Sequence, residues 1–285
     1  MALPAADEFA WARQRRANVR AAGGILDLVL PLRESGGGPA LFCPPPLVGV
    51  SWCYLALLPD IAPEYPIYAL QSRGLRRPEP LPLDMAELAR DFADQIRITQ
   101  PHGPYHLFGW SLGGNMAHAI AEEFERRGDE VGLLVIGDAT PMLPWSLDPD
   151  DTWLLCNFVL REFGYQPAIA PEAPDPVASM LQLIRARPGL GLDEWPDRRV
   201  LALPRVIRNN IAVARDHRPG RTTCPVLFLA ATETEDTTDE KLASWRDHLD
   251  DPIDVVEVDC KHEHMLLPRP IVRIGAAITA RLSPV

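Results

Sequence analysis

The chain has 285 residues, a formal net charge of −11 at pH 7 and 47% hydrophobic residues. This is enough for a large α/β domain with a full apolar core. The acidic balance argues against a general nucleic-acid-binding protein, which needs basic patches. Apolar runs stay below the ~20 residues of a membrane span, and charges near the N-terminus exclude a signal-peptide core, so the sequence predicts a cytoplasmic protein.

Strand-like and helix-like patterns alternate along most of the chain. Residues 1–24 are polar and end at a Gly-Gly pair, which predicts an arm or linker before a domain over residues 25–285. Short apolar runs predict strands at 25–33, 40–43, 66–70, 105–108, 131–137, 225–231 and 253–258. Helices are expected at 52–61, 85–100, 116–124 and 271–282. This order implies an α/β fold with a mostly parallel central sheet flanked by helices.

Residues 142–220 interrupt the alternation. They contain helix-like segments at 152–163, 177–187 and 200–215, joined by proline-rich stretches. The insertion is too long for a simple crossover between two strands of one sheet. We expect a helical lid over the functional site. The alternative is a separate small domain, although nothing in the composition indicates an independent core.

The cysteine pattern does not indicate a disulfide framework or a metal site. The five cysteines are odd in number and scattered, which predicts buried free thiols. Cys260, His262 and His264 superficially resemble metal ligands. The chain lacks an H-E-x-x-H motif and a second ligand cluster, so no metal site is expected.

The most informative motif is a G-x-S-x-G pattern formed by Gly109, Ser111 and Gly113. An apolar, strand-like run precedes it and a helix-like run follows it, which is the context of a nucleophile elbow. The glycines allow a sharp turn that presents the serine hydroxyl at the end of the sheet. The motif alone is often only a turn, but this context predicts a nucleophilic Ser111.

A nucleophilic serine needs a base, and the base needs an orienting carboxylate. Asp138 directly follows the predicted strand 131–137, and the alternative acids lie in the loop 233–236, including Asp236. The loop is the commoner position of the acid across the broad class of serine hydrolases, but we favour Asp138 because it directly follows the strand. His262 follows the strand 253–258 and is the predicted base, with His264 as the competitor.

An oxyanion hole requires two backbone N–H donors. One is expected from Leu112, the residue after the nucleophile, and the second from the loop after strand 40–43, near Leu47. A separate basic loop carries Arg73, Arg76 and Arg77. It is either a solvated loop, which is the commoner case, or a site for a phosphate group.

Longer stretches resemble one family, the type I thioesterase domains that terminate nonribosomal peptide synthetases. The resemblance rests on PLRESGGGPALFCPPPLVGVSWCY, YALQSRGL, YHLFGWSLGGNMAHAIAEEF, LLVIGDATP and VDCKHEHMLLP. It implies an α/β-hydrolase fold and a Ser–His–Asp triad with the acid after the sixth strand. This favours Asp138. In the family the catalytic histidine lies three residues before a Met-Leu or similar pair, here Met265-Leu266, which favours His262 over His264. The family's first oxyanion loop is often H-P-x-G-G, whereas this chain has Pro45-Pro46-Leu47-Val48-Gly49.

The resemblance also implies the reaction. A peptide would arrive as a thioester on the phosphopantetheine of a peptidyl carrier protein domain, with no cofactor bound directly by the chain. It would be released from a peptidyl-O-Ser111 intermediate by hydrolysis or by macrocyclisation, and the apolar lid slightly favours cyclisation. The alternatives are a stand-alone editing (type II) thioesterase, an esterase acting on free substrates and a non-catalytic binding module on the hydrolase fold.

Overall fold

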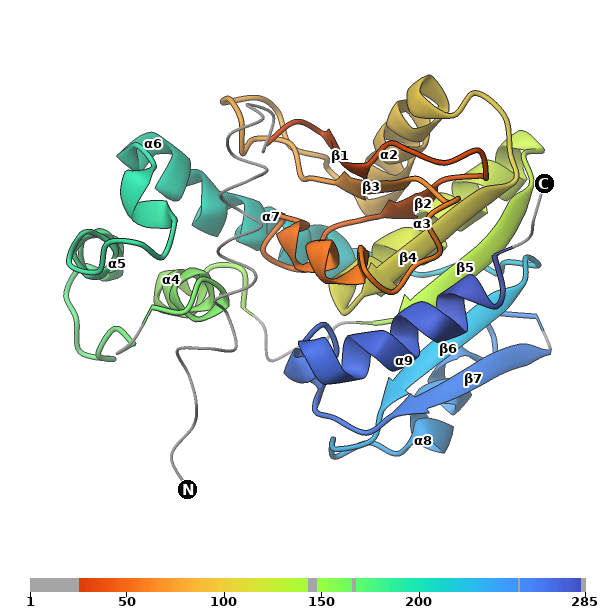
Figure 1. Ribbon diagram of the computed structural model, residues 1–285. Coiled ribbons are helices and arrows are strands. Elements are labelled where there is room, and N and C mark those ends of the chain that lie inside the picture. The colour runs from red at the N-terminus through yellow and green to blue at the C-terminus, as the bar shows by residue number, and fades with distance from the viewer. Residues whose placement is uncertain (1–25, 143–147, 166–167, 251, 283–285) are drawn as a thin grey trace.

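A seven-stranded sheet forms the centre of the molecule in the computed structural model (Figure 1). The structure describes residues 26–142, 148–165, 168–250 and 252–282, so the predicted arm at 1–24 lies outside it. The spatial order is β1-β3-β2-β4-β5-β6-β7, in which β1 is antiparallel to β3 and the other pairs are parallel. The strands are β1 Val29–Arg33, β2 Leu41–Cys43, β3 Ile67–Leu70, β4 Tyr105–Trp110, β5 Val131–Gly137, β6 Val226–Ala231 and β7 Ile253–Val258.

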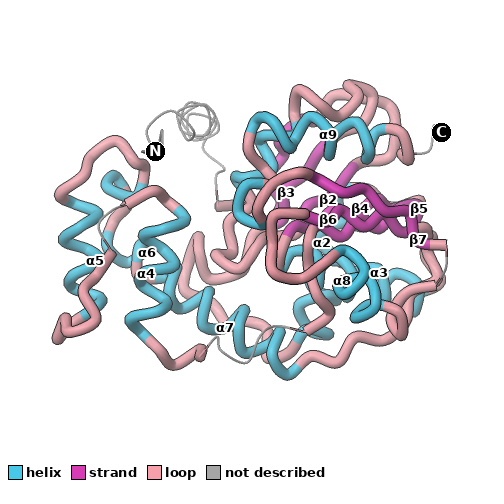
Figure 2. Tube along the Cα trace, turned by 90° about the horizontal axis from the view of Figure 1, so that it is seen from below, coloured by secondary structure: helices cyan, strands magenta, loops and turns pink. Residues whose placement is uncertain are grey.

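Helices cover both faces of the sheet, as Figure 2 shows, with α9 on one face and α2, α3 and α8 on the other. This arrangement confirms the predicted fold class. The helices of these layers are η1 Trp52–Leu57, α2 Met85–Thr99, α3 Leu112–Arg127, α8 Thr238–Trp245, η3 His262–His264 and α9 Pro268–Thr279. Between β5 and β6 lie α4 Thr152–Glu162, α5 Pro176–Arg185, η2 Leu192–Glu194, α6 Asp197–Val200 and α7 Ala202–Asp216.

Two apolar layers hold these helices on the sheet. Phe92 of α2 and Ile120 of α3 pack with Trp245 of α8 on one face. Ile274 of α9 and Tyr54 of η1 belong to the layer on the other face. All six residues of β4 and of β6 are buried, as expected for central strands of a parallel sheet covered on both sides. The ends of these strands are therefore rigid points from which a site can be built.

The helical segment between β5 and β6 packs in a third apolar cluster, which it shares with residues of β1 and β3. Leu160 of α4, Met180 of α5 and Ile207 of α7 are fully buried in it, together with Val50 and Trp52 from the loop after β2 and from η1. In Figure 1, α4, α5 and α6 lie to one side of the sheet, and the long α7 runs from them toward it. The segment thus packs both on itself and on the β1–β3 side of the sheet.

Several elements differ from the sequence expectation, including the start of β1 and both ends of α9. The helix expected at 52–61 is only a 3₁₀ helix, η1, because Pro59 follows it and lacks an N–H for a further turn. Helix α3 begins at Leu112, four residues before the expected start. Helix α8 is not predicted, since its buried positions are Lys241 and Trp245 and a lysine does not contribute to an apolar pattern.

All five cysteines are free, as predicted, and four of them are buried, whereas Cys53 is partly exposed. Across the described residues, no helix is both long and apolar enough to cross a membrane. The same residues contain no group of three or more His, Cys, Asp or Glu side chains arranged to hold a metal ion.

Candidate active site

Ser111 occupies the sharp turn between β4 and α3. Its backbone has φ 57° and ψ −133°, a conformation that is unfavourable for a residue with a side chain. The turn is so tight that a Cβ on Gly109 would lie 1.8 Å from the carbonyl oxygen of Gly113. The Ser111 N–H donates to the Gly137 carbonyl of β5 at 2.9 Å. A Cβ on Gly113 would lie 2.8 Å from the Pro44 carbonyl oxygen, so both motif glycines are required by close backbone approach. The serine projects from the carboxyl end of the sheet.

Asp138 is the first residue after β5 and also has a left-handed backbone, with φ 48°. The Asp138 N–H donates to the Leu229 carbonyl of β6 at 2.7 Å, which fixes the backbone where the strand ends. The side chain is almost completely buried, and its Oδ1 accepts from the Ala231 N–H at 3.0 Å. This anchoring leaves Oδ2 free for another donor.

His262 joins Ser111 and Asp138. Its Nδ1–H donates to Asp138 Oδ2 at 2.8 Å, and its Nε2 accepts from the Ser111 hydroxyl at 3.0 Å. A carboxylate can only accept, so this geometry assigns the proton to Nδ1 and leaves Nε2 as a base. The ring stacks on Trp110 at 5.3 Å between centroids, and the Trp110 Nε1–H donates to the His262 carbonyl at 3.1 Å. The imidazole is thus held on three sides.

Burial and neighbouring charges act in opposite directions on the pKa of Asp138. Burial raises the pKa of its carboxyl group, but hydrogen bonds from His262 and Lys241 outweigh this effect and leave the pKa below its ordinary value. The carboxylate is therefore ionised at neutral pH. It can orient the imidazole and stabilise the imidazolium that forms when His262 takes a proton.

The structure brings Ser111, Asp138 and His262 together and leaves the alternatives apart. In the described part of the chain, no hydrogen bond links His262 to the loop 233–236, although Asp236 lies at the edge of the same cavity. His264 lies in η3 and is not among the residues that line the cavity. Of the candidates weighed from the sequence, Asp138 and His262 have the geometry that a triad requires.

Leu112 and Leu47 both border the cavity at Ser111. Leu112 is the first residue of α3, where backbone N–H groups have no partner inside the helix and the helix dipole favours negative charge. The loop after β2 begins with three prolines, Pro44 to Pro46, so Leu47 supplies its first N–H group. Both positions suit donors to an oxyanion.

A cavity of about 390 Å³ opens above these groups. The helical segment forms part of its wall through three residues of α4: Phe158, Arg161 and Glu162. The Arg161 guanidinium lies 5.2 Å from the centre of the Phe158 ring. Burial raises the pKa of Glu162, while Arg161 and His262 act in the opposite direction. The cavity thus combines an apolar wall with a few charged groups.

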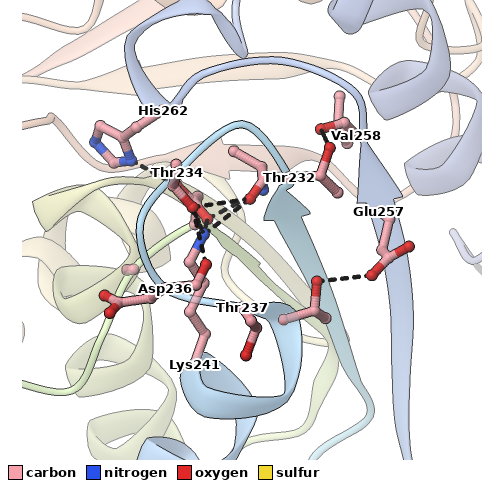
Figure 3. A network of polar contacts seen from close by, with 12 residues as sticks. Thr232, Thr234, Asp236, Thr237, Lys241, Glu257, Val258 and His262 are labelled. Carbon is pink, nitrogen blue, oxygen red and sulfur yellow. Dashed lines mark hydrogen bonds and ion pairs between the residues drawn. The ribbon is translucent and has the colours of Figure 1, made fainter.

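Three side chains that support the site were not singled out from the sequence. Tyr54 Oη donates to the Pro44 carbonyl and accepts from the Trp110 N–H, both at 2.9 Å, which joins the proline loop to the end of β4. Asn210 of α7 donates from Nδ2 to the Leu47 carbonyl at 3.0 Å. The third is Lys241, which extends from α8 toward Thr234 (Figure 3).

The basic loop is held by acidic residues of the chain. Arg73 binds Asp91 and Glu79, and Arg76 pairs with Asp27. These arginines are not among the residues that line the cavity. Their ion pairs fasten the loop to α2 and its surroundings, which agrees with the reading of a solvated surface loop and gives no support to a phosphate site.

Comparison with known families identifies the fold that carries this geometry. Residues 39–276 match the family described as Thioesterase domain. The chain belongs to this family. A thioesterase domain is a hydrolase of thioesters, and the match includes Ser111, Asp138 and His262.

The relatives are large multidomain synthetases. The chain is 37% identical over 260 residues to a dimodular nonribosomal peptide synthase of Bacillus subtilis, covering 90% of the chain and 11% of that protein. It is 33% identical over 259 residues to malpibaldin synthetase of Mortierella alpina, covering 90% of the chain and 4% of that protein. The chain thus spans only a small part of the length of these relatives.

Solved structures show the same fold at lower identity. A holo four-domain nonribosomal peptide synthetase, AB3403, matches with a TM-score of 0.80 and 23% identity over 90% of the chain and 20% of that protein. The NocB thioesterase domain of the nocardicin cluster matches with a TM-score of 0.63 and 22% identity, covering 90% of the chain and 98% of that domain. These neighbours confirm the α/β-hydrolase fold inferred from the sequence.

Proposed function

We propose that this thioesterase domain releases a finished peptide from a nonribosomal peptide synthetase by serine catalysis. The observation that carries the proposal is the hydrogen-bonded series Ser111, His262 and Asp138. These residues follow the carboxyl ends of β4, β7 and β5, respectively. In this mechanism Ser111 is the nucleophile, His262 transfers protons and Asp138 orients and stabilises the imidazolium.

The first half-reaction transfers the peptide to the enzyme. The peptide is delivered as a thioester on the phosphopantetheine arm of a peptidyl carrier protein domain, which is a substrate and not a resident cofactor. His262 accepts the Ser111 proton while the serine oxygen attacks the thioester carbonyl. The N–H groups of Leu112 and Leu47 stabilise the oxyanion. The carbon–sulfur bond then breaks, the thiolate takes the proton from His262, and a peptidyl-O-Ser111 ester remains.

The second half-reaction releases the peptide. His262 removes a proton from a second nucleophile, which attacks the ester and restores Ser111. Water gives a linear acid, whereas an amine or hydroxyl of the peptide itself gives a macrocycle. The apolar Phe158 wall would limit the access of water to the ester, and so supports cyclisation.

The proposed domain comprises residues 25–285, with the insertion at about 142–220 as its lid. We infer that it works in the cytoplasm, beside its carrier domain. Matches over 90% of the chain to multidomain synthetases disfavour a stand-alone editing thioesterase. The presence of all three triad side chains in bonding geometry disfavours a non-catalytic binding module.

Mass spectrometry with a panel of peptidyl-N-acetylcysteamine thioesters tests the proposal, with Ser111→Ala beside the wild type. A transient acyl adduct on Ser111, absent together with the product in Ser111→Ala, is the expected result. A product lighter than the linear acid by one water identifies cyclisation. Equal turnover by Ser111→Ala and the wild type would overturn the nucleophile assignment.

A further inference from the structure

Lysine is rare in this chain. The 28 basic residues include only two lysines, Lys241 and Lys261, and the rest are arginines. Lys241 lies on α8 with only 5% of its surface exposed. Burying an ammonium group is costly unless its charge is paired and its hydrogen bonds are satisfied. Its position beneath the site therefore requires a specific partner.

All three N–H donors of the Lys241 ammonium have an acceptor. The Nζ donates to Asp138 Oδ1 at 2.6 Å, to the Ala231 carbonyl at 2.9 Å and to the Thr234 hydroxyl at 2.8 Å. Figure 3 shows Lys241 reaching from α8 to the loop that carries Thr234, on the side of the site where His262 lies. A compact ammonium can satisfy three acceptors grouped around one point, whereas the planar guanidinium of arginine cannot.

These contacts divide the Asp138 carboxylate into two halves. Oδ1 accepts from Lys241 and from the Ala231 N–H, and Oδ2 accepts from His262. A rotation of the carboxylate would break the Lys241 bond and the His262 bond together. Lys241 and the Ala231 N–H together therefore fix which oxygen faces the imidazole, and the positive charge of Lys241 lies on the far side of the same carboxylate.

We propose that Lys241 is a positioning residue for the serine mechanism. It holds Asp138 in the orientation that directs His262 toward Ser111, and its charge limits the attraction of Asp138 for a proton on the imidazole. The proposal rests on the proposed function, in which a neutral His262 accepts the Ser111 proton. Loss of Lys241 should therefore slow the reaction of Ser111 most at low pH.

The effect of removing the Lys241 charge depends on the other charged groups near His262. Besides Asp138 and Lys241, the charged groups at the cavity are Glu162 and Arg161 of α4, Asp236 of the loop after β6, and Glu263 of η3. Loss of the Lys241 charge leaves all of these in place. The negative charge of Asp138 then acts on the imidazole with one fewer positive charge opposing it, so a variant without the Lys241 charge should favour the imidazolium.

The experiment measures the rate of fluorophosphonate labelling of Ser111 between pH 5 and 9, which requires no knowledge of the peptide. Lys241→Met removes both charge and donors, and Lys241→Gln removes the charge but keeps a donor for Asp138. We expect both variants to move the acid limb of the profile upward by about one pH unit. The Gln variant keeps the proposal testable if the Met variant does not fold.

Lys261→Met is the matched control, because it removes the other lysine from an exposed position directly beside His262 in the chain. Solvent screens that charge, so its acid limb should stay within about 0.3 pH units of the wild type. An acid limb that stays in place or moves downward in Lys241→Gln would overturn the proposal, whatever the change in stability. Failure of the wild type to label at any pH would instead contradict the serine mechanism itself.

Discussion

The sheet and the helical segment between β5 and β6 place residues in the same cavity by different means. Ser111 and Asp138 directly follow fully buried strand ends, where backbone hydrogen bonds to neighbouring strands fix them. Phe158 belongs instead to a helix that packs in a separate apolar cluster. The comparison predicts that bond making depends on the sheet, whereas the segment shapes the space above it.

The largest effect should follow from a change at a strand end. Asp138→Asn keeps the shape of the side chain but removes the charge that orients His262 and stabilises the imidazolium. We expect kcat to fall by about 10⁴-fold. The measurement is single-turnover release from a peptidyl-N-acetylcysteamine thioester. Asp236→Asn, at the edge of the same cavity, is the control and should change kcat less than threefold, on the order of a lost surface charge. Similar losses of kcat in the two variants would contradict the assignment of Asp138, rather than Asp236, as the acid of the triad.

A smaller fall in kcat is expected where α7 of the segment holds the loop after β2. Asn210→Ala removes the hydrogen bond from α7 to the Leu47 carbonyl, so the loop that carries the proposed oxyanion donor loses a fixed position. We expect kcat to fall by roughly 10- to 100-fold. Asn209→Ala is a matched control, since that side chain binds the Pro82 carbonyl instead. If the two variants lose equal activity at equal stability, Asn210 does not act through Leu47.

Low pH should reduce the stability of the folded protein through His106, a fully buried residue of β4. Burial lowers the pKa of His106 from 6.5 to about 4. The unfolded chain therefore takes up this proton first as the pH falls, and stability present above pH 6.5 is lost toward pH 4. His106 should account for about 2 kcal/mol of the loss between pH 7 and pH 5. Burial also lowers the pKa values of His118 in α3 and of His217 at the end of α7 to about 4, so a variant of His106 is needed to isolate its contribution.

Urea unfolding at pH 7 and pH 5 measures this contribution by comparing the wild type with His106→Asn. The variant is expected to be less stable at pH 7, because a buried ring is lost, but to show a smaller difference between the two pH values. An identical pH dependence in both proteins would show that His106 does not carry the effect.

The smallest effect on rate is expected from the cavity wall of the segment. Phe158→Ala should change the ratio of cyclic to linear product a few-fold, because water enters the space that the ring leaves. Fluorophosphonate labelling of Ser111 should stay within about twofold, since the triad is untouched. Leu154→Ala is the control on the same helix, at a position that does not line the cavity. Product analysis by mass spectrometry distinguishes the two. A large loss of labelling in Phe158→Ala would contradict the separation of roles.

The sequence was most informative where local pattern and topology coincide. Apolar runs identify the parallel strands, and residues directly after such runs must lie at one edge of the sheet. Ser111, Asp138 and His262 could therefore be proposed together, although they are far apart in the chain. The choice of Asp138 over the loop 233–236 also used placement after a strand, and the hydrogen bond to His262 now supports it.

Supporting contacts could not be predicted in this way. Lys241 meets Asp138 across 103 residues, and Asn210 meets Leu47 across 163. A single lysine or asparagine in a polar stretch has no periodicity that identifies its partner, and such residues are mostly exposed. The same reason explains why α8 was missed, since an inward-facing lysine weakens the apolar signal of its helix.

The backbone at Ser111 and Asp138 has a consequence for the history of such a sequence. Both residues adopt positive φ values, at a cost on the order of 1–3 kcal/mol each for residues with side chains. Glycine would relieve this cost but would abolish the nucleophile or the carboxylate. At Ser111, selection for thermal stability would therefore favour glycine, whereas selection for turnover would favour serine. At Asp138, glycine would also leave the buried ammonium of Lys241 without its charged partner, so the carboxylate supports both the fold and the proposed mechanism.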